Sequence, residues 1–159
     1  MIQYSKIRDT AVKGLSQYLA VPVIRRNQAA PAPKYPFLSY AVLTLASSNN
    51  GTWQKHEDGK DRKLVRHSWS ITAQSDDNAE SVELAMKARD WLDRVGRTWL
   101  KDNGVTVQSV TEITNRDNIL SVGYEYKNGF DVFFYAFDEV DNPDADNIIE
   151  NATIKGGMN

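Results

Sequence analysis

The sequence contains no cysteine among its 159 residues. This absence excludes disulfide bonds, zinc sites built from thiolates and cysteine nucleophiles, so side-chain packing must hold the fold together. There are only two histidines, His56 and His67, and neither has a second ligand at the spacing typical of metal sites. We therefore expect no metal site and no cofactor.

Motifs for catalysis and nucleotide binding are also missing. No Gly-x-Ser-x-Gly occurs, and the adjacent glycines Gly156 and Gly157 lie near the end of the chain rather than before a helix. The acidic stretch DEVDNPDADNIIE places Asn147 where a calcium loop needs glycine and Thr153 where it needs a bidentate glutamate. The sequence therefore predicts that the protein is not an enzyme.

The chain has little net charge and no long apolar run. A formal charge of -2 and a pI near 5.7 do not provide the basic footprint that binding to nucleic acid requires. No segment approaches the roughly eighteen apolar residues of a membrane-spanning helix. Lys6 and Arg8 interrupt the N-terminal stretch MIQYSKIRDTAVKGL, which is unlike a signal peptide. We expect neither a membrane segment nor export.

One local group of basic residues lies near the middle of the chain. Its common meaning is a solvated strand end, and contact with DNA or with an acidic partner is the alternative. The group comprises Lys55, Lys60, Arg62, Lys63 and Arg66.

Apolar periodicity predicts two main helices. The first runs from about Ser5 to Ala20 and stops before Pro22. The second begins near Asp77, where Asp77-x-x-Glu80 resembles a capping box, and ends at Asn103–Gly104.

The remaining segments predict strands. Asn128–Gly129 predicts a tight hairpin between the last two strands, because both central positions of a type I′ turn need positive φ. This order of elements indicates an α+β fold in which two main helices pack on one face of a mostly antiparallel mixed sheet of about five to six strands. The predicted strands are residues 21–25, 37–45, 63–73, 105–113, 118–127 and 130–140.

The polar segment 46–61 is too long for a tight turn. It carries the turn pairs Asn50–Gly51 and Asp58–Gly59, which favour a protruding hairpin extension, and a solvated loop is the alternative. Trp53 is an aromatic side chain within this polar segment, an arrangement typical of a binding hot spot. We therefore expect Trp53 and His56 to contact another protein.

The last predicted strand carries large apolar side chains on both faces. Phe130, Val132, Phe134 and Ala136 share one face, and Phe133, Tyr135 and Phe137 share the other. Helices can cover one set, so the second set predicts either a subunit interface or burial under the long helix.

Four stretches together resemble a known family. These are VPVIRRNQAAPAPKYPFLSY, NNGTWQKHEDG, HSWSITAQSDDNAESVELAMKARDWLD and NGVTVQSVTEITNRDNILSVGYEYKNGFDVFFYAFDEV. They are similar to the phage neck or tail terminator proteins of long-tailed phages and of prophages of Gram-positive bacteria. The resemblance covers most of the chain from the first helix to Val140. It indicates one α+β domain over residues 1–142. The resemblance does not extend to residues 143–159, which we expect to form an acidic, flexible tail.

The resemblance implies a structural role in the virion and supplies no catalytic residues. Several copies, six in related terminators, form a ring at the head-proximal end of the tail tube and stop its growth. The partners implied are further copies of the chain, the tail tube protein and a head-side connector or stopper protein, while DNA passes through the lumen without specific binding. Assembly would take place in the cytoplasm of the bacterial host.

With such a ring in mind, the residues singled out above lead to two hypotheses of contact. Trp53 and His56 would contact the tube or a neighbouring subunit, and Phe133, Tyr135 and Phe137 would lie in the subunit seam. Two other functions stay open. One is another head-tail joining or neck component. The other is a small-ligand-binding or enzymatic domain whose pocket is lined by the aromatic residues with Tyr124, Tyr126 and His67.

Overall fold

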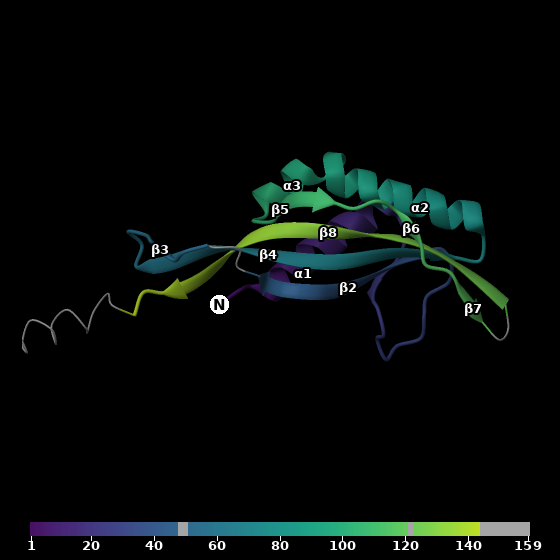
Figure 1. Cartoon of the computed structure of the whole chain (residues 1–159), viewed down its shortest axis with the longest axis horizontal. Helices are drawn as coiled ribbons and strands as arrows, with labels where there is room; N and C mark the ends of the chain where they lie inside the picture. The colour runs from purple at the N-terminus through teal and green to yellow at the C-terminus, as the bar shows by residue number, and fades with distance from the viewer. Residues whose placement is uncertain (48–50, 121–122, 144–159) are drawn as a thin grey trace, which may run out of the picture.

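The computed structural model describes residues 1–47, 51–120 and 123–143, with the backbone path alone for 118–120. It contains a long twisted sheet with helices packed against one of its faces (Figure 1). The α+β class expected from the sequence is confirmed. Nearly all of the predicted C-terminal tail, residues 143–159, lies outside the described residues.

Helix α1 spans Tyr4–Leu19, close to its predicted bounds. The predicted start of the second helix is also confirmed, because the Asp77 side chain accepts a hydrogen bond of 2.9 Å from the Glu80 backbone nitrogen. The prediction of one continuous second helix is wrong. Helix α2 (Asn78–Asp90) leads into a π-helical turn, η1 (Trp91–Val95), and then into α3 (Arg97–Asp102).

The break between η1 and α3 lies at Gly96, which packs directly against an aromatic ring. A Cβ atom at Gly96 would lie 2.3 Å from Trp91 Cε2, so only glycine allows the ring to lie there. Trp91 itself is buried in the core. The change from π-helix to α-helix therefore coincides with the packing of the Trp91 ring against Gly96. The apolar periodicity of the sequence does not reveal this contact.

The strands are ordered β1-β2-β4-β8-β5 across the sheet, with β3, β6 and β7 pairing at its ends. Strand β1 is parallel to β2, and the other strand pairs are antiparallel, which confirms the mixed, mostly antiparallel sheet. The strand bounds are β1 Val23–Arg25, β2 Phe37–Ser47, β3 Gln54–Lys55, β4 Lys60–Ser75, β5 Thr106–Val110, β6 Thr114–Asn115, β7 Asn118–Leu120 and β8 Gly123–Asp141.

The hairpin predicted at Asn128–Gly129 does not exist. Strand β8 runs straight through both residues, which pair with Ala73 and Thr72 of β4, and the chain reverses between β7 and β8 instead. Gly129 allows β4 and β8 to approach closely and does not form a turn, because a Cβ atom there would lie 2.5 Å from the Ile71 carbonyl oxygen. Asn128 Nδ2 donates a hydrogen bond of 3.0 Å to Ser81 Oγ, which ties this part of β8 to α2.

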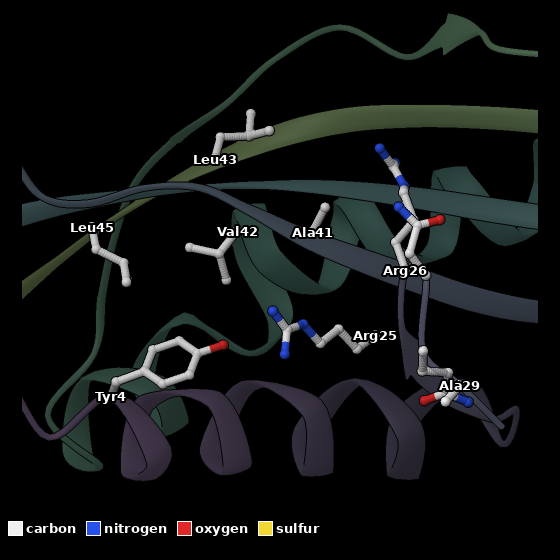
Figure 2. A pocket seen from close by; sticks show the side chains of 10 residues that line it. Tyr4, Arg25, Arg26, Ala29, Ala41, Val42, Leu43 and Leu45 are labelled. Carbon is white, nitrogen blue, oxygen red and sulfur yellow. The ribbon is translucent and has the colours of Figure 1, made fainter.

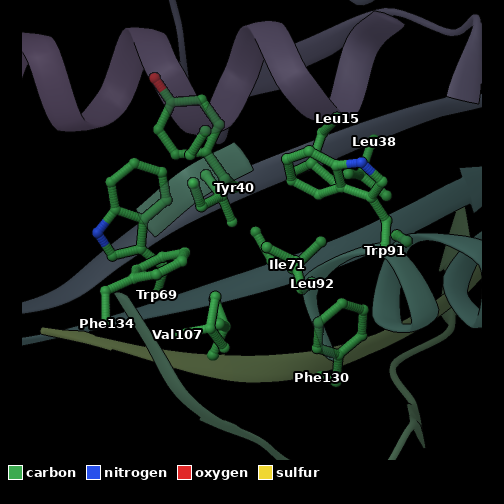
Figure 3. Close-up of a cluster of buried hydrophobic side chains, with 14 of the residues drawn as sticks. Leu15, Leu38, Tyr40, Trp69, Ile71, Trp91, Leu92, Val107, Phe130 and Phe134 are labelled. Atoms are coloured by element: carbon green, nitrogen blue, oxygen red, sulfur yellow. The ribbon is translucent and has the colours of Figure 1, made fainter. Parts of the chain in front are cut away.

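The hydrophobic core lies between the helices and the sheet (Figure 3). Trp69 is central, because it stacks on Tyr40 at a centroid distance of 5.2 Å and meets Phe134 edge-on at 5.4 Å. Leu15 of α1 and Leu92 of η1 close the core from the helix side. Burial of each such side chain contributes about 1.5 to 3 kcal/mol to folding.

Strands β4 and β8 pair along the whole of β4 and most of β8, from Lys60 opposite Asp141 to Ser75 opposite Tyr126. At one end they extend past the helices together with β3 (Figure 1). We call this extension, residues 52–63 and 138–141, the arm. It carries part of the predicted interaction surface.

Candidate interaction surface

The arm contains the hairpin predicted around Trp53 and His56. Gln54 pairs with Arg62, and the turn is closed by two hydrogen bonds in which His56 N donates to Lys60 O at 3.0 Å and Gly59 N donates to His56 O at 3.2 Å. Trp53 and His56 are both exposed. The protruding extension is therefore confirmed, although Asn50 of the predicted Asn50–Gly51 pair lies outside the described residues.

An ion-pair network stiffens the arm. Glu139 accepts from Lys60 Nζ at 2.8 Å and from Arg62 Nε at 2.7 Å, and Arg62 also reaches Asp58 at 2.5 Å. The hydrogen bonds from Lys60 and Arg62 lower the pKa of Glu139, and the one from Arg62 lowers the pKa of Asp58. Two members of the basic group thus pair with carboxylates of the same chain, which favours the strand-end interpretation.

The second predicted set of aromatic residues lies on the sheet face away from the helices, called here the open face. Phe133 and Tyr135 are half-buried, and Phe137 is 58% exposed. The guanidinium carbon of Arg66 lies 4.3 Å from the centroid of the Phe133 ring, and Leu64 pairs with Phe137. Burial of this set under the long helix is therefore wrong, and a role in a subunit interface stays a prediction.

The structure does not bring the two predicted contact sets into one patch. The first set is Trp53 with His56, and the second is Phe133, Tyr135 and Phe137. Lys63 Nζ lies 6.0 Å from the centroid of the Trp53 ring, and Lys63 alternates with Leu64 along β4. Leu64 and Phe137 lie on the open face, so Lys63 belongs to the opposite side of the strand. The chain accordingly offers two distinct surfaces at this end of the sheet.

Two arginines cover the polar middle of the open face. Arg26 Nη2 donates to Thr72 Oγ1 at 2.9 Å, and Arg116 Nη1 donates to Ser70 Oγ at 2.6 Å. Arg116 also pairs with Asp131 at 3.2 Å. Sequence reasoning missed both arginines. The available signal was the row of hydroxyl residues in β4, which needs hydrogen-bond partners once it is buried.

The alternative ligand pocket is not assembled. His67 is buried, its Nδ1 accepts a hydrogen bond of 3.3 Å from Ala46 N, and burial lowers its pKa. His67 pairs with Phe134, whereas Tyr126 pairs with Ser75 eight residues further along β4, and Tyr124 is exposed. Among the residues that the structure describes, no three His, Asp or Glu side chains form a group that fits a metal ion.

A groove of about 890 Å³ runs beside strand β2 (Figure 2). Its walls are the segment from Arg25 to Ala29, Tyr4 of α1 and four residues of β2, which are Ala41, Val42, Leu43 and Leu45. Leu43 and Leu45 are large apolar side chains that the chain leaves exposed there. The groove is open and mixed in polarity, which suits a polypeptide segment more than an enclosed small molecule.

Residues 9–157 match the model of a family described as phage neck terminator protein. The chain belongs to this family. The resemblance found in the sequence is thereby confirmed over nearly the whole chain, and it places the protein among the structural proteins of the phage neck.

Other comparisons add little to this family assignment. One solved structure, described as "Virion of native gene transfer agent (GTA) particle", matches with 15% identity over 86% of this chain and 91% of that chain, at a TM-score of 0.35. At this TM-score the likeness supports no conclusion about function. None of the curated proteins matches this chain. No helix in the described part of the chain is long and apolar enough to cross a membrane.

Proposed function

We propose that this protein forms a ring at the head-proximal end of the phage tail tube, ends polymerisation of the tube and joins the tail to the head. The observation that carries this proposal is the match to the neck terminator family over residues 9–157. The role is structural and requires neither catalysis nor a cofactor.

Ring closure gives a physical reason for termination. A head-to-tail interface that closes on itself produces a ring, whereas one that does not close produces a filament. A closed ring presents faces above and below that differ from the seams between its subunits. A ring can therefore add to the tube end without offering a site for the next tube subunit.

The two surfaces described above divide the contacts. Phe133, Tyr135 and Phe137 on the open face meet a neighbouring subunit, because an exposed phenylalanine forgoes about 1.5 to 3 kcal/mol of burial. Trp53 and His56 on the arm meet the tube or a neighbour. Weak contacts from each subunit act together once the ring exists, and such linkage raises avidity by about 10² to 10⁴.

The partners are further copies of the chain, about six in a ring, together with the tail tube protein and a head-side connector or stopper protein. DNA passes through the lumen without specific binding, in keeping with a net charge of -2 on the subunit. The ring assembles in the cytoplasm of the bacterial host and remains in the virion.

Removal of the protein from the phage that encodes it tests the proposal. Electron micrographs of lysates should show free heads and tail tubes of uncontrolled, excess length, and expression of the protein from a plasmid should restore uniform tails. Tubes of normal length that stay separate from heads would instead identify a head-tail joining component. Normal, infectious virions without the protein would contradict both roles.

A further inference from the structure

One edge of the sheet is open along half of strand β2. Strand β1 pairs only with Leu38, Ser39 and Tyr40, and the contact ends where Arg26 N donates to Tyr40 O at 2.8 Å. From Ala41 to Ser47 the strand pairs with β4 on its inner side through Ala41, Val42, Thr44 and Ser47, with a register shift on each side of Thr44, and no described strand lies along its outer side. An open edge of this kind is a template for a further strand.

A second open edge lies on strand β8, on the opposite side of the sheet. Strand β5 pairs with β8 only from Val132 to Tyr135. From Ala136 to Asp141 the strand is paired with β4 and borders no other described strand, although the terminal nitrogen of Met1 donates to the Glu139 carbonyl there.

The outer edge of β5, by contrast, is covered within the chain. Arg97 Nη2 donates to Val107 O at 2.8 Å and to Gln108 O at 3.2 Å. A side chain thus occupies the carbonyl groups that a further strand would need. Natural sheets commonly protect edges in this way, and on the β8 edge the Met1 nitrogen occupies one carbonyl, that of Glu139, whereas Arg97 occupies two on the shorter β5.

Each open edge carries exposed apolar side chains on both faces, and the β8 edge also carries Asp138, Glu139 and Asp141. Leu43 points away from α1, on the open face, and Leu45 points toward α1 (Figure 2). On β8, Phe137 lies on the open face and Val140 on the opposite face, as the alternation of the strand requires. Leu43 and Leu45 are 52% and 50% exposed, so each edge leaves apolar surface uncovered on each face.

Strand direction is compatible with a ring. Strands β2 and β8 are both antiparallel to β4, so they run in the same direction within one subunit. Around a cyclic axis that lies roughly along the strands, each neighbour keeps this direction. The β8 edge of one copy would then meet the β2 edge of the next as a parallel pair, and the same contact would repeat at each seam.

We propose that the open edge of β8, residues 136–141, adds as a strand to the open edge of β2, residues 41–47, in the adjacent copy, and that this pairing forms the subunit seam. The inference rests on the proposed ring and deepens it. Phe137 of one copy packs on Leu43 of the next on the open face, and Val140 packs on Leu45 on the other face. The groove beside β2 receives the incoming strand.

Cysteine cross-linking tests the pairing cleanly, because the chain has no cysteine of its own. The double variant Leu43→Cys with Phe137→Cys is treated with a short bis-maleimide and separated on a denaturing gel. We expect a ladder of covalent species that ends at the copy number of the ring. The matched control is Val95→Cys with Phe137→Cys, because Val95 is 56% exposed but lies in the helix layer. It should give at least about tenfold less cross-linked product.

The two single variants distinguish a head-to-tail contact from a two-fold contact. A mixture of Leu43→Cys and Phe137→Cys proteins should give covalent dimers, and neither variant should cross-link to itself. Self-linking of Leu43→Cys alone would show a two-fold contact between β2 edges and overturn the proposal. If light scattering shows rings but the double variant gives no cross-linked product, the proposed seam is wrong and the proposed ring is still supported. A protein that stays monomeric at every concentration would overturn both.

A charge on the open edge provides a second readout that requires no cross-linker. Leu43→Lys should leave the melting temperature unchanged and raise the concentration for half-assembly by at least about tenfold, because a buried charge would replace the apolar contact between Leu43 and Phe137. Val95→Lys should assemble as the unmodified protein does. Assembly of Leu43→Lys equal to that of Val95→Lys would contradict the seam.

Discussion

Phe133 and Phe134 are consecutive residues of β8, yet their side chains lie on opposite faces of the sheet. Phe134 is 1% exposed and meets Trp69 edge-on, whereas Phe133 lies on the open face beneath the guanidinium of Arg66. One strand therefore contributes to the core and to the surface at adjacent positions. Substitutions at these two residues separate folding from assembly.

Phe133→Asp should fold normally and fail to assemble, because it adds a charge to the open face without opening the core. Phe134→Asp should destabilise the protein by more than about 4 kcal/mol, because it buries an unpaired carboxylate. Thermal melts followed by circular dichroism, together with light scattering, measure both effects. An unfolded Phe133→Asp protein, or one that assembles normally, would contradict the assignment of Phe133 to an interface.

Gly129→Ala should lower the free energy of unfolding by about 1 to 3 kcal/mol, because the new methyl group would meet the Ile71 carbonyl in the middle of the β4–β8 pairing. Gly123→Ala is the matched control in the same strand, since a Cβ atom there meets nothing within 4 Å. Urea denaturation of both variants checks the prediction. Equal stability of the two would contradict the continuous path of β8 through Asn128 and Gly129.

His67 should make the protein less stable as the pH falls below neutral. Burial lowers the pKa of His67 in the folded state, so the unfolded chain takes up a proton at a higher pH than the folded chain does. The stabilisation is fully present above the unfolded value of about 6.5 and is lost as the pH falls through the folded pKa. In a His56→Gln background, NMR titration of the remaining imidazole reads this pKa directly. A value at or above about 6.5 would show that His67 is not buried as described.

Shortening the arm between residues 50 and 59 should leave the fold of the subunit intact and abolish control of tail length. The described residues from Thr52 to Asp58 are exposed, so their removal costs little core packing. Circular dichroism checks the fold, and tail lengths in electron micrographs check function. Tails of normal length with the shortened protein would exclude Trp53 and His56 from the contact with the tube.

Local patterns predicted the features that depend on nearby residues. Alternation along the last strand placed Phe133 and Phe134 on opposite faces without showing which face the helices cover, and the spacing of Asp77 and Glu80 identified the start of α2. Both signals arise within a few residues of sequence. The α+β class followed from the order of the predicted helices and strands, whereas the face that the helices cover did not.

Features that depend on distant contacts were not predictable in this way. Asn-Gly is typical of a tight turn, but Gly129 is required by the approach of Ile71 from β4, and sequence alone does not show that pairing. The break at Gly96 likewise reflects its contact with the Trp91 ring. Arg26 and Arg116 reach Ser70 and Thr72 from segments about 45 residues away on either side, so no local pattern connects them.

Light scattering of the purified protein across a concentration series, with negative-stain images of the same samples, tests the central claim most directly. The account predicts rings of about six copies that form from folded subunits as the concentration rises. A folded monomer at every concentration, with no rings in the images, would contradict it.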